Sequence, residues 1–382
     1  MMTEPVYIID AKRSPVHHVN GTFSKLEPEQ LTAPLYKHFQ CHHGINDRVP
    51  TDEVFMGNAV GPGGNLARLS LLEAGYDTSV PGVTVDRQCG SGLESVHQGF
   101  RHLQAGASET VLAGGVESIS RAPQRSFFAS EAYPVSSTQE RARFSPRFIG
   151  DPDMGEAAET VAKAYSISRA DQDAFAERSY RLSWEEAAKP DISREIVPVS
   201  TIQADAELRS PDKMNKIIRR APSVFQEHGT VTAANSSRIS DGAALTLMAS
   251  QSSCRQHGFV PVLEIVDAVS VGVDPTMPGV GPVPAVRRLL ARNRLSVQDI
   301  SLWECNEAFA SQVLASAYQL GIPPERLNTA GGAIAQGHPY GASGAILVAR
   351  LMRLMQNGDL PLGVATIGIG GGLGLASLYR LL

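Results

Sequence analysis

A cysteine in a glycine-bounded turn is the first residue of this 382-residue chain that could do chemistry. Cys89 follows the β-like run 83–85, and Gly90 and Gly92 come directly before a stretch with helical apolar spacing. A thiol at the start of a helix lies near the positive end of the helix dipole, which lowers its pKa and favours the thiolate. The glycines leave room for a substrate and leave N–H groups free for an oxyanion. A small buried residue at a tight junction fits the same pattern, so both interpretations stay open.

A histidine in a second glycine-rich turn is the next candidate. His338 stands between Gly337 and Gly341, ahead of an apolar helix predicted over 346–354. An imidazole near a thiol can take its proton and hold the thiolate. A structural histidine is the competing interpretation, although the surrounding glycines offer His338 few local side-chain partners.

An asparagine in an acidic turn is the third candidate. Asn306 lies within the segment 303–310, where a helix is predicted to begin. An asparagine can position a water molecule or donate to an oxyanion. A helix N-cap, with Glu307 in the first turn, is the alternative.

Three further groupings have simpler interpretations. The glycine-rich run 366–374 lacks the Lys-Ser/Thr pair of a phosphate-binding loop, so a tight turn between two buried strands fits it better. Cys41, His42 and His43 are consecutive, so their side chains diverge, and we predict no metal site. A basic stretch is typical of a solvated face but could also meet a nucleotide phosphate. Its residues are Arg209, Lys213, Lys216, Arg219 and Arg220.

The elements around these candidates alternate between strand-like and helix-like segments, which favours an α/β fold. Strands are predicted at 6–11, 83–85, 110–113 and 261–273, and a helix from Leu93 to about residue 106. A strand, glycine turn and helix are predicted over 327–354. The middle of the chain is more charged and irregular, with one clear helix from Ser168, capped by Asp171, to about Ala188. We therefore expect two similar halves, 1–118 and 248–382, with a loop domain inserted at 119–247.

Composition limits the function further. With 34 Lys+Arg against 39 Asp+Glu, the net charge of −5 argues against nucleic acid or an anionic membrane as a partner. The chain has no apolar run long enough to span a bilayer, and its N-terminus predicts no secretory signal. Four scattered cysteines do not make a disulfide framework, so we expect a cytoplasmic protein.

Taken together, these motifs resemble the thiolase family, the acyl-CoA C-acyltransferases. The cysteine loop, an NEAF box at 306–309, a GHPYGASG box at 337–344 and a glycine box at 368–374 stand in the family's order. Segments 231–237 and 281–285 match as well. The resemblance implies a five-layered αβαβα fold, a homodimer or homotetramer, and a coenzyme A thioester as substrate with no other cofactor.

The resemblance also implies roles for individual residues. Cys89 would accept the acyl group and His338 would activate it, while Asn306, through a water, would join His338 in binding the second substrate's thioester oxygen. The N–H groups of Cys89 and Gly370 would form the oxyanion hole. Four residues would line the pantetheine tunnel, and the basic stretch would lie near the CoA phosphates. The tunnel residues are Ser237, Phe225, Met154 and Phe309.

One position departs from the family in a way that bears on activity. Gly368 stands where most thiolases carry a second cysteine that moves the α-proton. Cys305 is not expected to replace it, because its side chain should point away from that of Asn306. Smaller departures are Pro278, where a methionine is usual, and Arg238, where a glycine is usual. The resemblance thus implies an acyl-CoA C-acyltransferase that condenses or thiolytically cleaves short acyl-CoA thioesters through an acyl-Cys89 intermediate. A hydrolase or acyltransferase without C–C bond chemistry, and a non-catalytic acyl-CoA-binding protein, are the alternatives.

Overall fold

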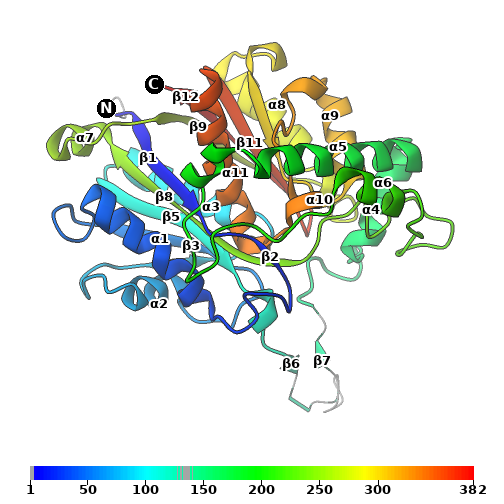
Figure 1. The fold of residues 1–382 in the computed structure, drawn as a ribbon, viewed down its shortest axis with the longest axis horizontal. Coiled ribbons are helices and arrows are strands. Elements are labelled where there is room, and N and C mark those ends of the chain that lie inside the picture. The colour runs from blue at the N-terminus through cyan, green and yellow to red at the C-terminus, as the bar shows by residue number, and fades with distance from the viewer. Residues whose placement is uncertain (1–3, 127, 130, 132–137, 140) are drawn as a thin grey trace.

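A mixed sheet of ten strands runs through the centre of the structure (Figure 1). The computed structural model describes residues 4–126, 128–129, 131, 138–139 and 141–382. Residues 1–3, which begin the segment expected to carry no secretory signal, lie outside the described residues. The strand order is β10 (Leu302–Cys305), β11 (Leu362–Ile369), β12 (Leu373–Leu381), β9 (Leu263–Gly272), β1 (Val6–Arg13), β8 (Ser240–Ser250), β5 (Thr110–Glu117), β3 (Glu53–Gly57) and β4 (Val83–Val85), with β2 (His17–His18) beside β8.

Two halves of this sheet repeat one pairing pattern. From β1 through β8, β5 and β3 the pairs run antiparallel, antiparallel and parallel. From β9 through β12, β11 and β10 the same sequence of pairs recurs. The halves meet where Tyr7 and Ile8 of β1 pair with β9. Where the first half adds β4, the second has only a parallel bridge between Trp303 and Leu327, so the strand predicted at the start of 327–354 is wrong.

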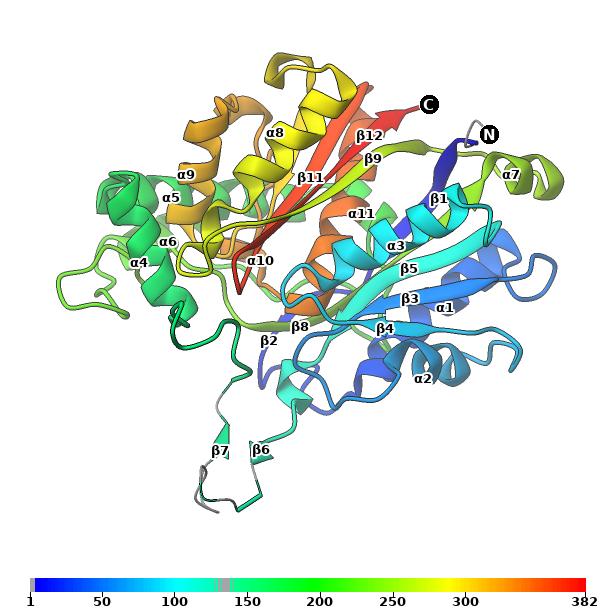
Figure 2. The same cartoon turned by 180° about the vertical axis from the view of Figure 1, so that it is seen from behind.

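Helices lie outside and between the two halves and make five layers (Figures 1 and 2). Helices α1 (Pro28–His43) and α2 (Leu66–Glu73) cover the first half. Helices α8 (Pro282–Asn293) and α9 (Ala310–Leu320) cover the second. Between the halves lie α3 (Ser91–Gln104) and α11 (Tyr340–Gly358), which contact each other and strands of both halves. Apolar side chains of α3 and α11 fill this central layer together with side chains of β11 and β12.

A long excursion of the chain separates β5 from β8. It contains η1 (Ile119–Arg121), the hairpin of β6 (Arg125–Ser126) and β7 (Thr138–Gln139), α4 (Met154–Ala164), α5 (Arg169–Ala187), η2 (Pro190–Arg194) and α6 (Pro211–Ile218). The capping box predicted at Ser168 and Asp171 is confirmed at the start of α5. The boundary predicted at residue 247 falls inside β8, and the division into three domains stays a prediction. The remaining elements are α7 (Gln251–His257), η3 (Pro278–Val280), η4 (Val297–Asp299), η5 (Pro324–Arg326) and α10 (Ala333–Gln336).

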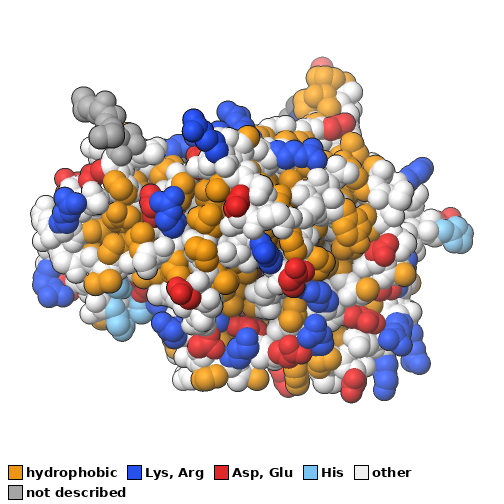
Figure 3. All heavy atoms as spheres, turned by 90° about the horizontal axis from the view of Figure 1, so that it is seen from above, with side chains coloured by type: hydrophobic (Ala, Val, Ile, Leu, Met, Phe, Trp, Pro, Cys, Tyr) orange, Lys and Arg blue, Asp and Glu red, His pale blue; other side chains and the backbone are white. Residues whose placement is uncertain are grey.

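The surface mixes charges of both signs. On the face seen in Figure 3, Lys and Arg side chains lie interspersed with Asp and Glu, with apolar patches between them. Among the described residues, no helix is both long enough and apolar enough to cross a bilayer.

Candidate active site

The cysteine loop packs tightly against two other glycine-rich segments. Cys89 lies between β4 and α3, one residue before the helix N-cap Gly90. A Cβ on Gly90 would lie 2.3 Å from Cδ1 of Ile369, and one on Gly92 would lie 2.6 Å from the carbonyl oxygen of Gly341. The expectation that these glycines leave room for a substrate is wrong. They let the start of α3 pack against β11 and α11. This packing brings the cysteine loop, the glycine box and the histidine loop together.

The electrostatics of Cys89 also differ from the expectation. Its half-buried side chain has a raised pKa of about 12, because burial disfavours the thiolate and the charge of Glu117 adds to that effect. The helix N-terminus does not outweigh this loss of solvation, so the predicted lowering of the pKa is wrong. The backbone N–H groups of Cys89 and Gly370 oppose the rise, which places both of them next to the sulfur. They are the pair that the family resemblance assigns to the oxyanion hole.

His338 is held as a neutral base in the loop between α10 and α11. Its Nδ1 lies 2.6 Å from Oγ of Ser343, whose hydroxyl donates to the carbonyl of Pro339 at 3.0 Å. Because that hydroxyl has one proton, Nδ1–H must be the donor to Ser343, which leaves the lone pair on Nε2. Nε2 is buried and has no hydrogen-bond partner among the described residues. Burial lowers the pKa of His338 to about 4, so the ring is neutral at pH 7.

Asn306 presents a second buried polar atom. Its backbone N–H donates to the carbonyl of Thr366 at 3.0 Å, which fixes it beside β11. The N-cap of α9 is Phe309, so the N-cap interpretation of Asn306 is wrong. Its Nδ2 is buried and, within the part of the chain that the structure describes, unpartnered. Buried polar atoms normally have partners, so Nδ2 of Asn306 and Nε2 of His338 are available to groups of a ligand.

A network of hydrogen bonds fixes the loop of Asn306 to the loop of His338. The side chain of Asn328 accepts from the N–H of Cys305 at 2.8 Å and donates to its carbonyl at 2.9 Å. It also donates to Glu307 at 2.8 Å, and Glu307 accepts from the N–H of Ile334 at 3.2 Å. These contacts surround Asn306 and reach α10, which leads directly to His338.

The four residues predicted to line a pantetheine tunnel lie close together. The rings of Phe225 and Phe309 pack edge to face with centroids 6.1 Å apart. Gly155, next to Met154, lies directly under Phe225, where a Cβ would be 2.1 Å from the ring. Ser237 donates its N–H to Ala308 at 2.9 Å, beside Phe309. Sδ of Met154 lies 3.4 Å from where a Cβ on Gly370 would stand, so this group adjoins the cysteine loop.

Glu117 is a site residue that the sequence analysis missed. It ends β5, is fully buried, and accepts from the N–H groups of Ala59, Val60 and Gly341 and from Nδ2 of Asn58. Burial raises its pKa to about 7. Its contact with Gly341 ties the histidine loop to the first half of the chain. A glutamate four residues after the predicted strand 110–113 was the only local signal.

Two aromatic residues were also missed. The ring of Tyr340 packs against His338 with centroids 5.1 Å apart, and burial and the charge of Cys89 raise its pKa. Phe144, from the excursion, lies over the glycine box, 3.3 Å from where a Cβ on Gly370 would stand. Arg141 stacks on the outer side of that ring at 4.7 Å. Tyr340 thus lies against His338, and Phe144 lies against the glycine box.

Comparison with known proteins agrees with this geometry. Residues 6–252 match the family described as "Thiolase, N-terminal domain", and residues 259–380 match "Thiolase, C-terminal domain". The chain belongs to the thiolase family. A Staphylococcus epidermidis protein named "Putative acetyl-CoA C-acetyltransferase VraB" is 48% identical over 390 residues, covering 99% of both chains. Its namesake from Staphylococcus aureus is 45% identical over 379 residues, covering 97% of this chain and 98% of the other.

Solved structures confirm the thiolase-like fold. The Bacillus anthracis acetyl-CoA acetyltransferase superposes with a TM-score of 0.91 at 30% identity, covering 100% of both chains. The human mitochondrial 3-ketoacyl-CoA thiolase in complex with CoA also has a TM-score of 0.91, at 32% identity, covering 100% of this chain and 99% of the other.

Gly368, which the family resemblance aligns with the second cysteine of most thiolases, has little space beside it. Gly368 lies in β11 opposite Gly374, and its φ is outside the left-handed region, so the backbone accepts a side chain there. A Cβ would stand 3.2 Å from both the carbonyl oxygen of Pro278 and Cδ of Pro282. The turn predicted between two buried strands is confirmed, with Gly371 and Gly372 at positive φ.

Cys305 is separated from Cys89 by the core. It packs in the apolar cluster shared with α8 and α9, whereas Cys89 contacts the cluster between the halves. Burial raises the pKa of the Cys305 thiol to about 12. Its position gives no reason to place it in the thiolase reaction.

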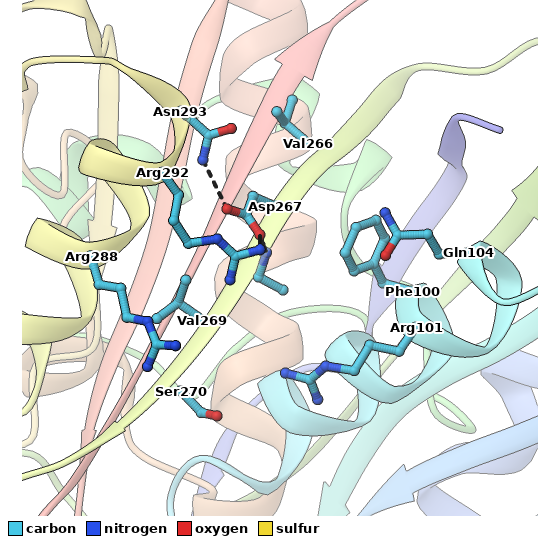
Figure 4. A pocket seen from close by; sticks show the side chains of 11 residues that line it. Phe100, Arg101, Gln104, Val266, Asp267, Val269, Ser270, Arg288, Arg292 and Asn293 are labelled. Carbon is cyan, nitrogen blue, oxygen red and sulfur yellow. Dashed lines mark hydrogen bonds and ion pairs between the residues drawn. The ribbon is translucent and has the colours of Figure 1, made fainter. Parts of the chain in front are cut away.

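A separate pocket of about 460 Å³ lies between the C-terminal end of α3, β9 and α8 (Figure 4). Arg101, Arg288 and Arg292 line it, and Asp267 pairs with Arg292 at 3.0 Å and with Asn293 at 2.9 Å. None of the predicted catalytic or CoA-binding residues lines it, so we assign it no part in the reaction.

Proposed function

We propose that this thiolase-family chain is an acyl-CoA C-acyltransferase that forms an acyl thioester on Cys89. The observation that carries the proposal is the packing of the Cys89 loop against the glycine box and the start of α11, where Gly90 meets Ile369 and Gly92 meets Gly341. The backbone N–H groups of Cys89 and Gly370 favour the thiolate of Cys89, and donors so placed stabilise the oxyanion of a thioester under attack. The names of the two solved relatives, acetyl-CoA acetyltransferase and 3-ketoacyl-CoA thiolase, support the same reaction class.

The acylation step follows from the protonation states of the two loops. Cys89 is a neutral thiol and His338 a neutral imidazole at pH 7, because their pKa values are about 12 and about 4. In the proposed step, Sγ of Cys89 attacks the thioester carbonyl carbon while its proton passes to Nε2 of His338. The carbon–sulfur bond to CoA then breaks, and the CoA thiolate leaves with that proton. Proton transfer in step with attack avoids an unsolvated thiolate.

The CoA moiety is proposed to lie along the tunnel group. Met154, Phe225 and Phe309 offer apolar surface to pantetheine, and Ser237 a hydroxyl. Helix α6 supports a site for the phosphates. Its buried residues Met214 and Ile218 anchor it, and the exposed residues of α6 and the two that follow it carry four cations beside Asp212. The exposed cations are Lys213, Lys216, Arg219 and Arg220.

The second half of the reaction distinguishes two candidate functions. In the proposed second step, Nε2 of His338 and Nδ2 of Asn306 bind a second thioester oxygen, directly or through water; both atoms are buried and unpartnered among the described residues, which supports this role. Gly368 supplies no group to move the α-proton, and the loss of a positioned acid–base group costs about 10²–10⁴-fold in rate. This glycine favours, as a second candidate, a hydrolase or acyltransferase that acylates Cys89 but makes no C–C bond.

Mass spectrometry after incubation with acetyl-CoA tests the first step. We expect one acetyl group on the peptide that contains Cys89, none in Cys89→Ala, and unchanged labelling in Cys41→Ala, which removes an exposed thiol elsewhere. Wild-type protein without an acetyl group on Cys89 would overturn the proposal. Incubation with acetoacetyl-CoA and CoA then tests the second step. Formation of acetyl-CoA supports the thiolase reaction, and acetylated Cys89 without it supports the second candidate.

A further inference from the structure

Three side chains far from the proposed active site converge on one point. Nε2 of His38 and Nε2 of His43, both on α1, each lie 3.0 Å from the same carboxylate oxygen, Oδ2 of Asp10 in β1. The three atoms all lie within 4.8 Å of one another. His43 belongs to the Cys41-His42-His43 run, where the divergence of adjacent side chains argued against a metal site. That argument holds for the run itself, but the fold joins His43 to residues outside it.

An irregularity in the backbone of β1 turns the side chain of Asp10 toward α1. The register with β8 shifts between Ile8 and Asp10, and such a bulge turns a side chain out of its regular alternation. The other oxygen, Oδ1, is already occupied, because it accepts from the N–H of Ala11 at 2.9 Å and contacts Nζ of Lys12 at 3.0 Å. Lys12 also donates to the carbonyl of Arg194, which holds it on that side. Among the described residues, Oδ2 is thereby presented to the two imidazoles alone.

We propose that Asp10, His38 and His43 bind a divalent transition-metal ion, with Zn²⁺ as the best match. Two imidazole nitrogens and one carboxylate oxygen are a ligand set typical of Zn²⁺. With metal–ligand bonds of about 2.0–2.1 Å in a tetrahedron, neighbouring ligand atoms stand roughly 3.3 Å apart. The two nitrogen–oxygen separations of 3.0 Å are close to this, and the two imidazole nitrogens lie within 4.8 Å of each other, so binding requires the two rings to adjust around Oδ2. Solvent completes the coordination.

The site is accessible yet structured. The side chains of His38 and His43 are 16% and 22% exposed, so an ion can reach them from solvent, whereas Asp10 is buried. His43 is the last residue of α1, and Asp10 lies in the central sheet. An ion bound there fixes the end of α1 to β1. The effect expected is on stability, because none of the proposed catalytic residues is involved.

Calorimetric titration of chelator-treated, buffer-exchanged full-length protein with ZnCl₂ tests the proposal. The background is Cys41→Ser, so that the exposed thiol on the same helix does not bind the ion. We expect one ion per chain and a higher midpoint of thermal unfolding with Zn²⁺. His38→Gln and His43→Gln should each weaken binding at least about tenfold, since even second-shell changes cost that much.

Two matched controls decide the outcome. His228→Gln removes a surface histidine that is 94% exposed, and Zn²⁺ binding should not change. Circular dichroism of each variant checks that it is folded. Absence of stoichiometric binding in the background protein, or binding of unchanged affinity in both His38→Gln and His43→Gln, would overturn the proposal. So would loss of binding in Cys89→Ser, because the ion would then belong to the active-site thiol.

Discussion

At the scale of single residues, the proposed reaction depends on two groups whose pKa values move apart. Burial raises that of Cys89 to about 12 and lowers that of His338 to about 4. Between these values thiol and imidazole are both neutral, so the free enzyme holds no preformed ion pair. The site is therefore set for proton transfer during attack, with Ser343 fixing which nitrogen of His338 is basic.

The rate of Cys89 acetylation should report the protonation of His338. Because a protonated ring cannot accept the thiol proton, the rate at low acetyl-CoA should fall as the pH drops through about 4 and be level near neutral pH. Quenched-flow mass spectrometry at a series of pH values measures this, with circular dichroism confirming that the chain is folded at each. A midpoint near 6.5, the ordinary value for histidine, would contradict a buried base.

Restoring a thiol at position 368 should strengthen the second half-reaction. We expect Gly368→Cys to raise thiolysis of acetoacetyl-CoA by about a hundredfold, the lower end of what a positioned acid–base group contributes. The contacts at 3.2 Å with Pro278 and Pro282 should cost about 1–3 kcal/mol in stability. Gly368→Ala carries the same Cβ without the thiol and is the matched control. Equal thiolysis rates for the two variants would show that the thiol is not what the wild-type chain lacks.

At the scale of elements, the features that depend on residues adjacent in the sequence were predicted correctly. The capping box of α5 and the strand–cysteine–helix junction were readable because their defining residues are adjacent. The role of Glu117 could not be predicted from the sequence, because its partner Gly341 is 224 residues away. The pKa of Cys89 was predicted in the wrong direction for the same reason, since burial among distant segments decides it. Residues around Leu327 have an apolar strand-like pattern, but only one bridge to β10 forms there.

The excursion is tied to the core by buried ion pairs, which gives a second stability prediction. Arg353 of α11 pairs with Glu186, Asp191 and Glu195, and Arg13 of β1 pairs with Glu195 from the other side. Burial alone would raise the pKa of Glu195, but the two arginines lower it to about 2. A lowered carboxylate pKa contributes stability above the unfolded value near 4.5, and that contribution is lost as the pH falls toward 2.

Arg353→Met should therefore destabilise the fold by about 3–5 kcal/mol near neutral pH, because it leaves buried carboxylates without their partner. The loss should shrink as the pH falls from 4.5 toward 2, where Glu195 becomes protonated in the wild type as well. Urea unfolding at several pH values measures both effects. Arg380→Met removes an arginine that is 51% exposed, and its pair with Glu264 should be worth less than about 1 kcal/mol. Equal effects of the two substitutions would contradict the argument.

At the scale of the whole molecule, one edge of the central sheet is covered and the other is open. Beyond β10, the chain at Leu327 and Asn328 bonds to Trp303, so this edge is covered. Beyond β4, no further strand lies within the described residues, and the open edge is bordered by exposed apolar side chains. Those side chains are Val83 at 42%, Leu69 at 45% and Leu72 at 39% exposure. An unpaired, apolar sheet edge is a surface that a second chain can cover.

We accordingly predict a homodimer in which the β4 edges of two copies meet. Light scattering after size-exclusion chromatography should give about twice the 40.8 kDa of one chain, and a tetramer would require a further interface. Val83→Lys combined with Leu69→Lys should shift the mass to one chain, because like charges would have to be buried without partners. Val260→Lys changes an apolar residue that is 80% exposed on a different part of the surface, and the mass should not change. A double variant that remains a dimer would place the interface elsewhere.

Since Cys89 follows β4 by four residues, dissociation of the double variant should also slow acetylation of Cys89. The Val260→Lys variant should be acetylated on Cys89 at the wild-type rate.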